Sequence, residues 1–276
     1  MKKLLTLLLT VLLGITACVS LIGCGKEKKQ ITVGITNAAP MNYKDASGNW
    51  VGFDTELTLA IFEELGYEVM FKEIEWSNKY IELNSGTIDC IWNGFTANSQ
   101  DKDSSGVLKD RSELVNFSMN YMINEQCVVK NKSVAFVDET SFDGKTIAFE
   151  NGSSGDTGVG YIEEDYTEIS FNKKGMTSQS AALQEVNAGT ADFAVVDKSI
   201  AENAAGLGYN NIEIVEFDYF SIEYYAIGFA KTDDGAALRD SVNTKLVEKY
   251  NSGLIKTLAE KYNIDFTNRV KPCFEK

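Results

Sequence analysis

The chain contains no histidine and only two prolines and five cysteines among its 276 residues. Without histidine, Ser-His-Asp catalysis, Cys-His catalysis and the usual zinc sites are excluded. Basic residues are also few, 26 against 40 acidic ones, and the formal net charge is −14. This charge argues against a nucleic-acid partner, because little is left to neutralise phosphates. We therefore expect no metal, no cofactor and no nucleic acid, in a chain long enough for one large domain or two ordinary ones.

The start of the chain is typical of an export signal. Lys2 and Lys3 precede an apolar run over 4–22, and the run ends in small residues. A charged start, an apolar stretch and small residues at the end are the parts of a secretory signal peptide. As a helix the run is nearly long enough to span a bilayer, so an uncleaved membrane anchor is the alternative. Either form places the folded part outside the cytoplasm.

The end of this segment resembles the bacterial lipobox, in which a cysteine is lipidated and becomes the new N-terminus. Residues 21–24 (LIGC) fit that pattern, and so do residues 15–18 (ITAC). Cys24 is favoured, because a polar segment follows it directly and provides a tether. We expect a lipoprotein on the outer face of the cell membrane, with a signal peptide over 1–23 and a tether over 24–30.

Three cysteines lie beyond Cys24, namely Cys90, Cys127 and Cys273. An odd number cannot all pair within one chain. Cys90 lies in an apolar stretch and is interpreted as a small core residue. Pairing of Cys127 with Cys273 is compatible with the sequence, but nothing in it requires that disulfide.

The chain alternates strand and helix patterns twice, which is typical of an α/β fold. In each half, helices with apolar residues at a spacing of 3.6 separate short β-branched strands. In the first half Asp54 is interpreted as the N-cap of one helix and Ser77 as that of the next. The predicted strands are 31–36, 68–74, 88–93, 146–150, 167–172 and 191–197, and the predicted helices are 54–65, 77–86, 153–164 and 177–188.

Two extended stretches, 121–130 and 220–230, are suited to carry the chain between two lobes and back. Two amphipathic helices over 235–251 and 254–263 would then complete the first lobe. Ligands of open α/β sheets bind beyond the carboxyl ends of the strands, so two facing lobes predict a hinged cleft. We expect a discontinuous lobe 1 over 31–121 and 226–276, a lobe 2 over 125–221, and hinge crossovers near 121–126 and 220–226.

A few residues are suited to line such a cleft. Arg111 is the only arginine before residue 239, and arginine pairs with carboxylates in a bidentate manner. Asp197 ends a predicted strand, where it could hold an ammonium group or cap the next helix. Residues 152–155 (GSSG) open a helix and offer backbone N–H groups and hydroxyls to an anion. The alternatives are a solvated loop residue for Arg111 and an ordinary core residue for Trp76.

The order of several motifs is similar to one family. Residues 49–54 (NWVGFD) resemble its G-x-x-V-G-F-D segment, and residues 83–94 resemble L-x-x-G-x-x-D-x-x-x-x-G. Residues 110–118 resemble E-R-x-x-x-V-D-F-S, with asparagine in place of aspartate. Residues 191–197 and 225–229 resemble A-D-A-V-x-x-D and Y-G-I-A-F. By these motifs the chain resembles the family 3 extracellular solute-binding proteins of polar amino acid ABC transporters, the glutamine-, histidine- and cystine-binding group.

The resemblance implies a two-lobed, type II periplasmic-binding-protein-like α/β fold and a specific ligand site. Arg111 would bind the α-carboxylate of an amino acid and Asp197 its α-ammonium group, while Trp76 would provide an aromatic wall. The further ligand-binding residues that the resemblance suggests are Asn37, Asn93, Gly94, Thr96, Glu150, Ser153, Ser154 and Gly155.

Two departures from the family pattern bear on specificity. An extra polar loop over 98–109 separates Thr96 from Arg111, and we expect it to protrude without moving the arginine. The loop over 37–41 lacks the acidic residue and the aromatic often present there, which disfavours a cationic ligand. Glu150, however, is expected close enough to the ligand to favour a cationic one.

The resulting hypothesis is a monomeric, non-enzymatic receptor that captures a polar amino acid. It would deliver the ligand to an ABC permease and ATPase in the membrane. Two alternatives come from other classes. One is a dehydratase-like enzyme on the same fold, in which carboxylates such as Glu150 perform acid–base chemistry. The other is a ligand-sensing partner of a membrane receptor.

Overall fold

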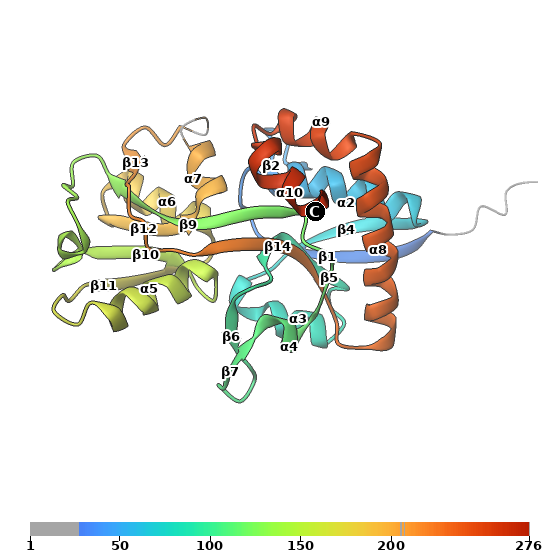
Figure 1. Cartoon of the computed structure of the whole chain (residues 1–276), viewed down its shortest axis with the longest axis horizontal. Helices are drawn as coiled ribbons and strands as arrows, with labels where there is room; N and C mark the ends of the chain where they lie inside the picture. The colour runs from blue at the N-terminus through green and yellow to red at the C-terminus, as the bar shows by residue number, and fades with distance from the viewer. Residues whose placement is uncertain (1–27, 205, 207, 276) are drawn as a thin grey trace, which may run out of the picture.

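The computed structural model describes residues 28–204, 206 and 208–275. The predicted signal peptide and the lipidation site Cys24 lie outside the described residues. The described chain forms two α/β lobes that lie side by side, as Figure 1 shows. One mixed sheet runs through both lobes in the order β11-β10-β12-β9-β14-β5-β1-β4, with β13 paired to β9 and β8 paired to β14.

The first lobe is built on parallel strands whose apolar side chains are buried. In the order β4-β1-β5, β1 pairs in parallel with both neighbours, and every residue of β5 is buried. A parallel strand covered on both faces has this near-continuous apolar sequence. The elements of this lobe are β1 (Lys29–Ile35), β4 (Tyr67–Glu73), β5 (Cys90–Thr96), α2 (Phe53–Glu64), α3 (Lys79–Asn84), α8 (Asp233–Asn251) and α9 (Leu254–Lys261).

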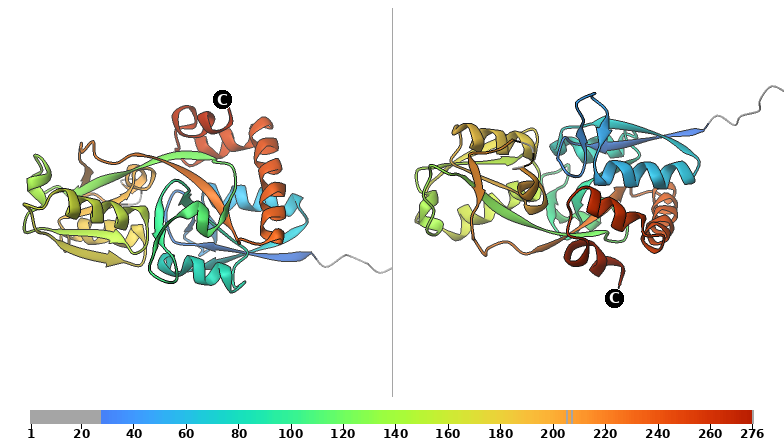
Figure 2. Two further views of the ribbon diagram at one scale, coloured as in Figure 1. Left: turned by 60° about the horizontal axis from the view of Figure 1, so that its bottom comes forward. Right: turned by 90° about the horizontal axis from the view of Figure 1, so that it is seen from above.

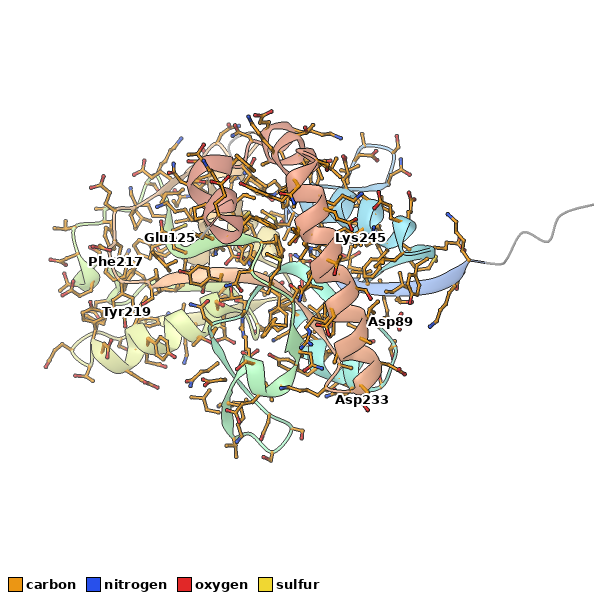
Figure 3. All side chains as sticks on the ribbon, turned by 45° about the vertical axis from the view of Figure 1, so that its right-hand side comes forward. Asp89, Glu125, Phe217, Tyr219, Asp233 and Lys245 are labelled. Atoms are coloured by element: carbon orange, nitrogen blue, oxygen red, sulfur yellow. The ribbon has the colours of Figure 1, made fainter. Side chains whose placement is uncertain are left out.

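Helix α8 belongs to the first lobe although it lies near the C-terminal end of the chain. Its N-cap Thr232 accepts a hydrogen bond from the backbone N–H of Gly235 at 3.0 Å. In Figure 3, Asp233 marks its beginning and Lys245 lies further along it. Lys245 pairs with Glu64 of α2 at 3.4 Å, which ties the late helix to the early one.

The second lobe repeats the plan with shorter parallel strands. β10 pairs in parallel with β11 and β12, and β12 is buried at every position. Helix α6 begins after the N-cap Ser178 and ends at Gly189, which has the positive φ of 75° that glycine adopts without strain. The elements are β10 (Thr146–Glu150), β11 (Asn172–Met176), β12 (Phe193–Asp197), β13 (Ile212–Ile214), α5 (Ser154–Asp165), α6 (Gln179–Ala188) and α7 (Lys198–Ala204).

Two long strands connect the lobes. β9 (Met122–Asn131) and β14 (Ile222–Phe229) pair with each other in antiparallel register, from Ile222 opposite Glu125 to Tyr225 opposite Met122. β9 then continues beside β12 in the second lobe, and β14 continues beside β5 in the first. Figure 2 shows from two further sides that these two strands run across the space between the lobes.

Several short elements complete the described chain. They are β2 (Tyr43–Lys44), β3 (Trp50–Val51), η2 (Trp76–Asn78), β6 (Gln100–Lys102), β7 (Leu108–Asp110), α4 (Arg111–Leu114), β8 (Asn116–Phe117), η3 (Glu139–Phe142), η5 (Phe266–Val270) and α10 (Lys271–Phe274). None of the helices in the described ranges has the length and apolar character required to cross a membrane.

Three local predictions were wrong. The strand predicted over 167–172 pairs only from Asn172 onward, because Ile169 and Phe171 pack on the core from a loop and the paired edge strand is polar. Ser77 lies inside the turn η2 and caps no helix. Asp54 lies within α2, where its carboxylate accepts from the backbone of Gly94 and from a tyrosine hydroxyl instead of capping the helix.

The cysteine interpretation is confirmed in part. Cys90 is a fully buried residue of β5, as expected for a small core residue. Cys127 is buried in β9, and no disulfide joins it to Cys273. The pairing that the sequence left open is therefore not present in the fold.

Candidate functional site

A small polar cavity with a volume of about 10 Å³ lies between the lobes, at the carboxyl ends of β5, β10 and β12. This is the position at which open α/β sheets bind ligands. Nine of the eleven residues suggested by the resemblance line it, and their roles toward a ligand stay predictions. They are Trp76, Asn93, Gly94, Thr96, Arg111, Glu150, Ser153, Ser154 and Asp197, joined by Gln179, which sequence reasoning missed.

Asp197 is held at the end of β12 by side-chain amides. Its carboxylate accepts hydrogen bonds from Asn124 at 3.0 Å, from Gln179 at 2.7 Å and from Gln126. The Gln179 carbonyl oxygen accepts the backbone N–H of Asp197 at 2.8 Å, which fixes the position from both sides. Burial raises the pKa of Asp197 above its ordinary value, although these amides act to lower it.

Two more buried carboxylates lie close by. Glu223 on β14 accepts from Thr96 at 3.1 Å and from Asn124 and Gln126 at 3.0 Å each. Burial and the charge of Asp197 raise its pKa. For Glu150 at the end of β10, the same two causes raise the pKa to about 8, and its Oε1 is a buried atom without a hydrogen-bond partner among the described residues.

Arg111 begins the short helix α4 and is 1% exposed. Its Nη1 donates to the Thr96 carbonyl at 3.0 Å and to the Ser154 hydroxyl at 3.2 Å, which bridges the two lobes. Its Nε and Nη2 donate to the two carboxylate oxygens of Asp101 at 3.0 and 3.2 Å. The arginine is therefore buried, as a ligand-binding residue would be, and already paired with a carboxylate of its own chain.

The extra loop over 98–109 is the source of that carboxylate. It folds as the hairpin β6–β7, which projects from the first lobe in Figure 1. The loop protrudes as expected, and Arg111 still lines the cavity, but the sequence did not indicate that Asp101 turns back from β6 onto Arg111. Asp101 also pairs with Lys79 at 3.0 Å and accepts from the Tyr80 hydroxyl at 2.7 Å.

The residues of the first-lobe wall are held by backbone contacts. The N–H of Gly94 donates to Asp54 at 2.9 Å, and with φ of 60° a Cβ at this position would lie 3.0 Å from the ring of Tyr225. The Asn93 side chain accepts from the backbone N–H of Thr36. Trp76 stands edge-on to a phenylalanine ring at 5.3 Å and forms an apolar side of the cavity.

Three residues at the start of α5 have different roles. The Ser153 hydroxyl caps the helix by accepting from the N–H of Asp156 at 3.2 Å. Ser154 faces Arg111. Gly155 lies outside the cavity lining but permits close packing, since a Cβ there would come within 2.6 Å of the Val195 carbonyl oxygen.

Asn37 is the other suggested residue outside the lining. Its side chain is exposed, and its backbone carbonyl accepts from the Ser180 hydroxyl of the second lobe at 3.0 Å. Asn37 thus takes part in contact between the lobes rather than in the wall of the cavity.

Sequence reasoning missed the amides and the second acidic residue of the site. Asn124 and Gln126 share the buried face of β9 on either side of Glu125, and Glu223 is a buried residue of β14, so two polar residues two positions apart on a crossover strand were the available signal. Gln179 follows a helix N-cap at the carboxyl end of a strand, which is also a ligand-facing position.

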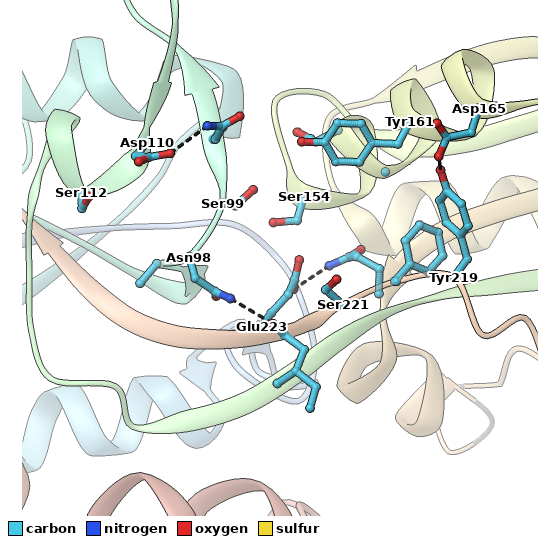
Figure 4. A pocket seen from close by; sticks show the side chains of 17 residues that line it. Asn98, Ser99, Asp110, Ser112, Ser154, Tyr161, Asp165, Tyr219, Ser221 and Glu223 are labelled. Atoms are coloured by element: carbon cyan, nitrogen blue, oxygen red, sulfur yellow. Dashed lines mark hydrogen bonds between the residues drawn. The ribbon is translucent and has the colours of Figure 1, made fainter.

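A larger hollow of about 710 Å³ adjoins the cavity and shares Ser154 with it. In Figure 4, Asn98, Ser99 and Asp110 lie on one side of this hollow, and Tyr161 and Tyr219 lie on the other. Gln126 and Glu223 also line it. We regard it as the approach to the cavity, because Arg111, Glu150 and Asp197, three buried groups with perturbed pKa values, line the smaller space.

Comparison with known proteins places this fold and site in a family. Residues 31–265 match the model of the bacterial extracellular solute-binding proteins, family 3. The chain is 29% identical over 273 residues to the Probable amino-acid-binding protein YxeM of Bacillus subtilis, covering 97% of both chains. It is 26% identical to the Arginine-binding extracellular protein ArtP of the same organism, covering 92% of both.

A solved structure agrees with these matches. The substrate-binding protein of an ABC uptake transporter from Streptococcus pneumoniae, solved with bound histidine, superimposes with a TM-score of 0.72. It is 28% identical in sequence and covers 84% of this chain and 92% of its own. The chain therefore belongs to the bacterial extracellular solute-binding proteins of family 3 and has the type II periplasmic-binding-protein fold. The matched relatives are named as binding proteins, not as enzymes.

Proposed function

We propose that this protein is the substrate-binding lipoprotein of an ABC importer, which captures a free polar amino acid between its lobes and delivers it to the membrane permease. The observation that carries the proposal is the position of Asp197. Three amides hold its buried carboxylate at the end of β12, in the cavity that Arg111 and Ser154 also line. No cation neutralises it among the described hydrogen bonds and ion pairs. A ligand ammonium group is the natural partner for such an anion.

The other groups of the cavity complete the recognition of an amino acid. The Nη1 edge of Arg111, with Ser154 and Thr96, lies where the α-carboxylate would bind. Trp76 provides an apolar side for the ligand. Because ligand and walls are both removed from water, each charged end needs a partner within the cavity.

The proposed transport role needs parts on either side of this cleft. The lobes over 31–121 with 226–276 and over 125–221 would close on the ligand by a hinge at 121–126 and 220–226, as periplasmic binding proteins do. A lipid on Cys24 would hold the monomer at the outer face of the membrane, beside the permease and its ATPase. The family match supports this location, because its members are extracellular solute-binding proteins.

Thermal unfolding against a ligand panel tests the proposal. The exported chain with Cys24→Ala, freed of carried-over ligand by unfolding and refolding, is measured with all standard amino acids, cystine and ornithine. Ligand at about 100 times its dissociation constant adds roughly 2.7 kcal/mol, which raises the Tm by about 5–10 °C in a chain of this size. We expect one or a few amino acids to do so, and a flat panel would contradict the proposal.

Substitution at Asp197 locates the site. Asp197→Asn removes the partner of the ammonium group at nearly constant shape, which costs about 2–5 kcal/mol and weakens binding by about 30-fold or more. The control is Asp165→Asn, the same charge change in the same lobe, at a carboxylate that accepts from Tyr219 in the adjoining hollow. Equal affinities for the two variants would place the ammonium site elsewhere.

A further inference from the structure

The hairpin β6–β7 brings a carboxylate to the two cations beside the cavity. Asp101 pairs with Arg111 through two hydrogen bonds, with Lys79 at 3.0 Å and with the Tyr80 hydroxyl at 2.7 Å. Its side chain is 10% exposed, against 1% for Arg111 and 2% for Lys79. Burial acts to raise the pKa of Asp101, but the two cations outweigh it and hold the pKa below the ordinary value. The residue is therefore an ionised, almost buried counter-ion.

This pairing uses most of the donors of both cations. A guanidinium group has five N–H donors, and Arg111 directs four of them at Asp101, Thr96 and Ser154. The Lys79 ammonium donates to the Gly152 carbonyl at 2.9 Å and lies over three aromatic rings besides pairing with Asp101. A ligand carboxylate thus meets cations that a resident carboxylate already neutralises.

The acidic groups of the cleft, in contrast to its cations, have no ion-pair partner among the described residues. Glu150, Asp197 and Glu223 are all buried, and amides and hydroxyls rather than cations make the hydrogen bonds to Asp197 and Glu223. The buried polar atoms left without a partner here, among the described residues, are all acceptor oxygens: Glu150 Oε1, Asn124 Oδ1 and Gln126 Oε1. The amide orientations are set by donation to the two acidic groups, so these oxygens face away from other acceptors.

We propose that Asp101 is a specificity-determining residue: by neutralising Arg111 and Lys79, it makes the cleft select ligands by their cationic groups, so that the preferred ligand carries two of them. One cation binds Asp197 and Glu223, and the other binds Glu150. The ligand's own carboxylate meets only the Nη1 edge of a neutralised Arg111, so it adds less to the affinity than either cationic group. This inference rests on the proposed function, since it assigns the ligand class of the same cleft.

The test compares amino acids with their decarboxylated counterparts by titration calorimetry on the refolded exported chain. The probe pairs are L-arginine with agmatine and L-lysine with cadaverine, and L-glutamine and L-glutamate complete the set. The expected result is that a dicationic ligand binds most tightly and that its decarboxylated counterpart binds within about 30-fold of it. A larger loss without the carboxylate would overturn the inference, as would tightest binding of a neutral or acidic amino acid.

Two variants of the hairpin separate the charge of Asp101 from the fold around it. Asp101→Asn releases Arg111 and Lys79 for a ligand carboxylate, so the preference for the amino acid over its amine should rise at least tenfold. Asp103→Asn is the matched control, because that carboxylate bonds only within the hairpin turn, to Ser105 and Val107, and should leave the preference unchanged. Equal preferences in the two variants would refute the role of Asp101.

A further variant keeps the test decisive if Asp101→Asn fails to fold. Glu150→Gln removes the second anionic partner and should weaken a dicationic ligand at least tenfold while changing L-glutamine by less than threefold. Equal losses for both ligands count against the inference. A wild-type protein that binds a neutral amino acid alone would refute the inference and retain the proposed function, whereas failure to bind any amino acid or amine would refute both.

Discussion

At the scale of single residues, the main feature of the cleft is its set of buried carboxylates. Glu150 is 2% exposed, and its closest charges are of both signs, Asp197 and Lys79. Burial is the largest cause of its raised pKa, the charge of Asp197 adds to it, and Lys79 opposes both. An ammonium or guanidinium group beside Glu150 would lower this pKa again. Ligand binding and proton release are therefore coupled at this residue.

The pH dependence of stability follows from the same shift. Glu150 titrates near 4.5 when unfolded and near 8 in the folded protein. Between these values the folded state binds more protons, so the stabilisation is fully present below pH 4.5 and is lost as the pH rises through 8. In urea unfolding without ligand, Glu150→Gln should gain stability relative to the wild type between pH 5 and pH 8, on the order of a few kcal/mol.

A second glutamate provides the control for this measurement. The hydrogen bond from Lys130 holds the pKa of the exposed Glu213 below its ordinary value, so that residue changes protonation only below the tested range. Glu213→Gln should therefore differ from the wild type by the same amount at pH 5 and pH 8. A parallel pH profile for Glu150→Gln would show that Glu150 is ionised at neutral pH in the folded protein.

The site residues that the sequence could identify are those marked by a rare residue type or by a position at the end of a strand. Arg111 stood out as the only arginine before residue 239 and Asp197 as an acid at the end of a strand, and the structure places both at the cavity. Asp101 gave no such signal, because it is one of two aspartates in a polar loop. Its role depends on how the hairpin folds back, which is a tertiary property.

At the scale of elements, the helix α5 sets the second-lobe wall of the cavity by how closely its first turn approaches β12. Gly155 makes this approach possible, since a Cβ would meet the Val195 carbonyl oxygen at 2.6 Å and Gln126 Oε1 at 3.3 Å. Gln126 in turn donates to Asp197 and Glu223. The packing of one glycine is thus linked to the position of the acidic groups.

Alanine substitutions in α5 test this link. Gly155→Ala should destabilise the protein by roughly 1–3 kcal/mol, as overpacking does, and should also weaken ligand binding through Gln126. Gly160→Ala lies in the same helix with nothing within 4 Å of its Cβ, so it should stabilise by about 0.5–1 kcal/mol. Chemical unfolding and ligand titration of both variants decide the matter, and similar effects of the two would contradict the packing argument.

Element boundaries were predictable where the backbone chemistry is local. Ser178 and Gly189 bound α6 by capping and by a positive φ, and both signals stand in the sequence. The strand β11 was misplaced because it is a polar edge strand, while the apolar residues before it pack from a loop. The apolar content of a segment indicates that it is buried. Whether the segment pairs as a strand depends on the strand beside it, which here is β10.

At the scale of the whole molecule, the contacts between the lobes besides the two crossover strands include the Arg269–Glu202 ion pair and the packing of Ala38 against the second-lobe core. Three further contacts are single hydrogen bonds. Lys79 donates to the Gly152 carbonyl, Arg111 to Ser154, and Ser180 to the Asn37 carbonyl. The first two lie in or beside the cavity, so changing them alters recognition as well as closure. Ser180 lies outside the cavity lining, and its hydroxyl reports on the contact between the lobes alone.

Removing that hydroxyl should shorten the lifetime of the complex. Ser180→Ala loses one exposed neutral hydrogen bond, worth about 0.5–1 kcal/mol, which corresponds to roughly two- to fivefold weaker binding. Because the bond forms only when the lobes meet, the loss should appear in the dissociation rate and leave the association rate nearly unchanged. Ser241→Ala is the control, since that hydroxyl donates to the Ala237 carbonyl within α8. Stopped-flow measurement with the identified ligand would contradict the hinge model if both variants dissociate at the same rate, or if Ser180→Ala changes association instead.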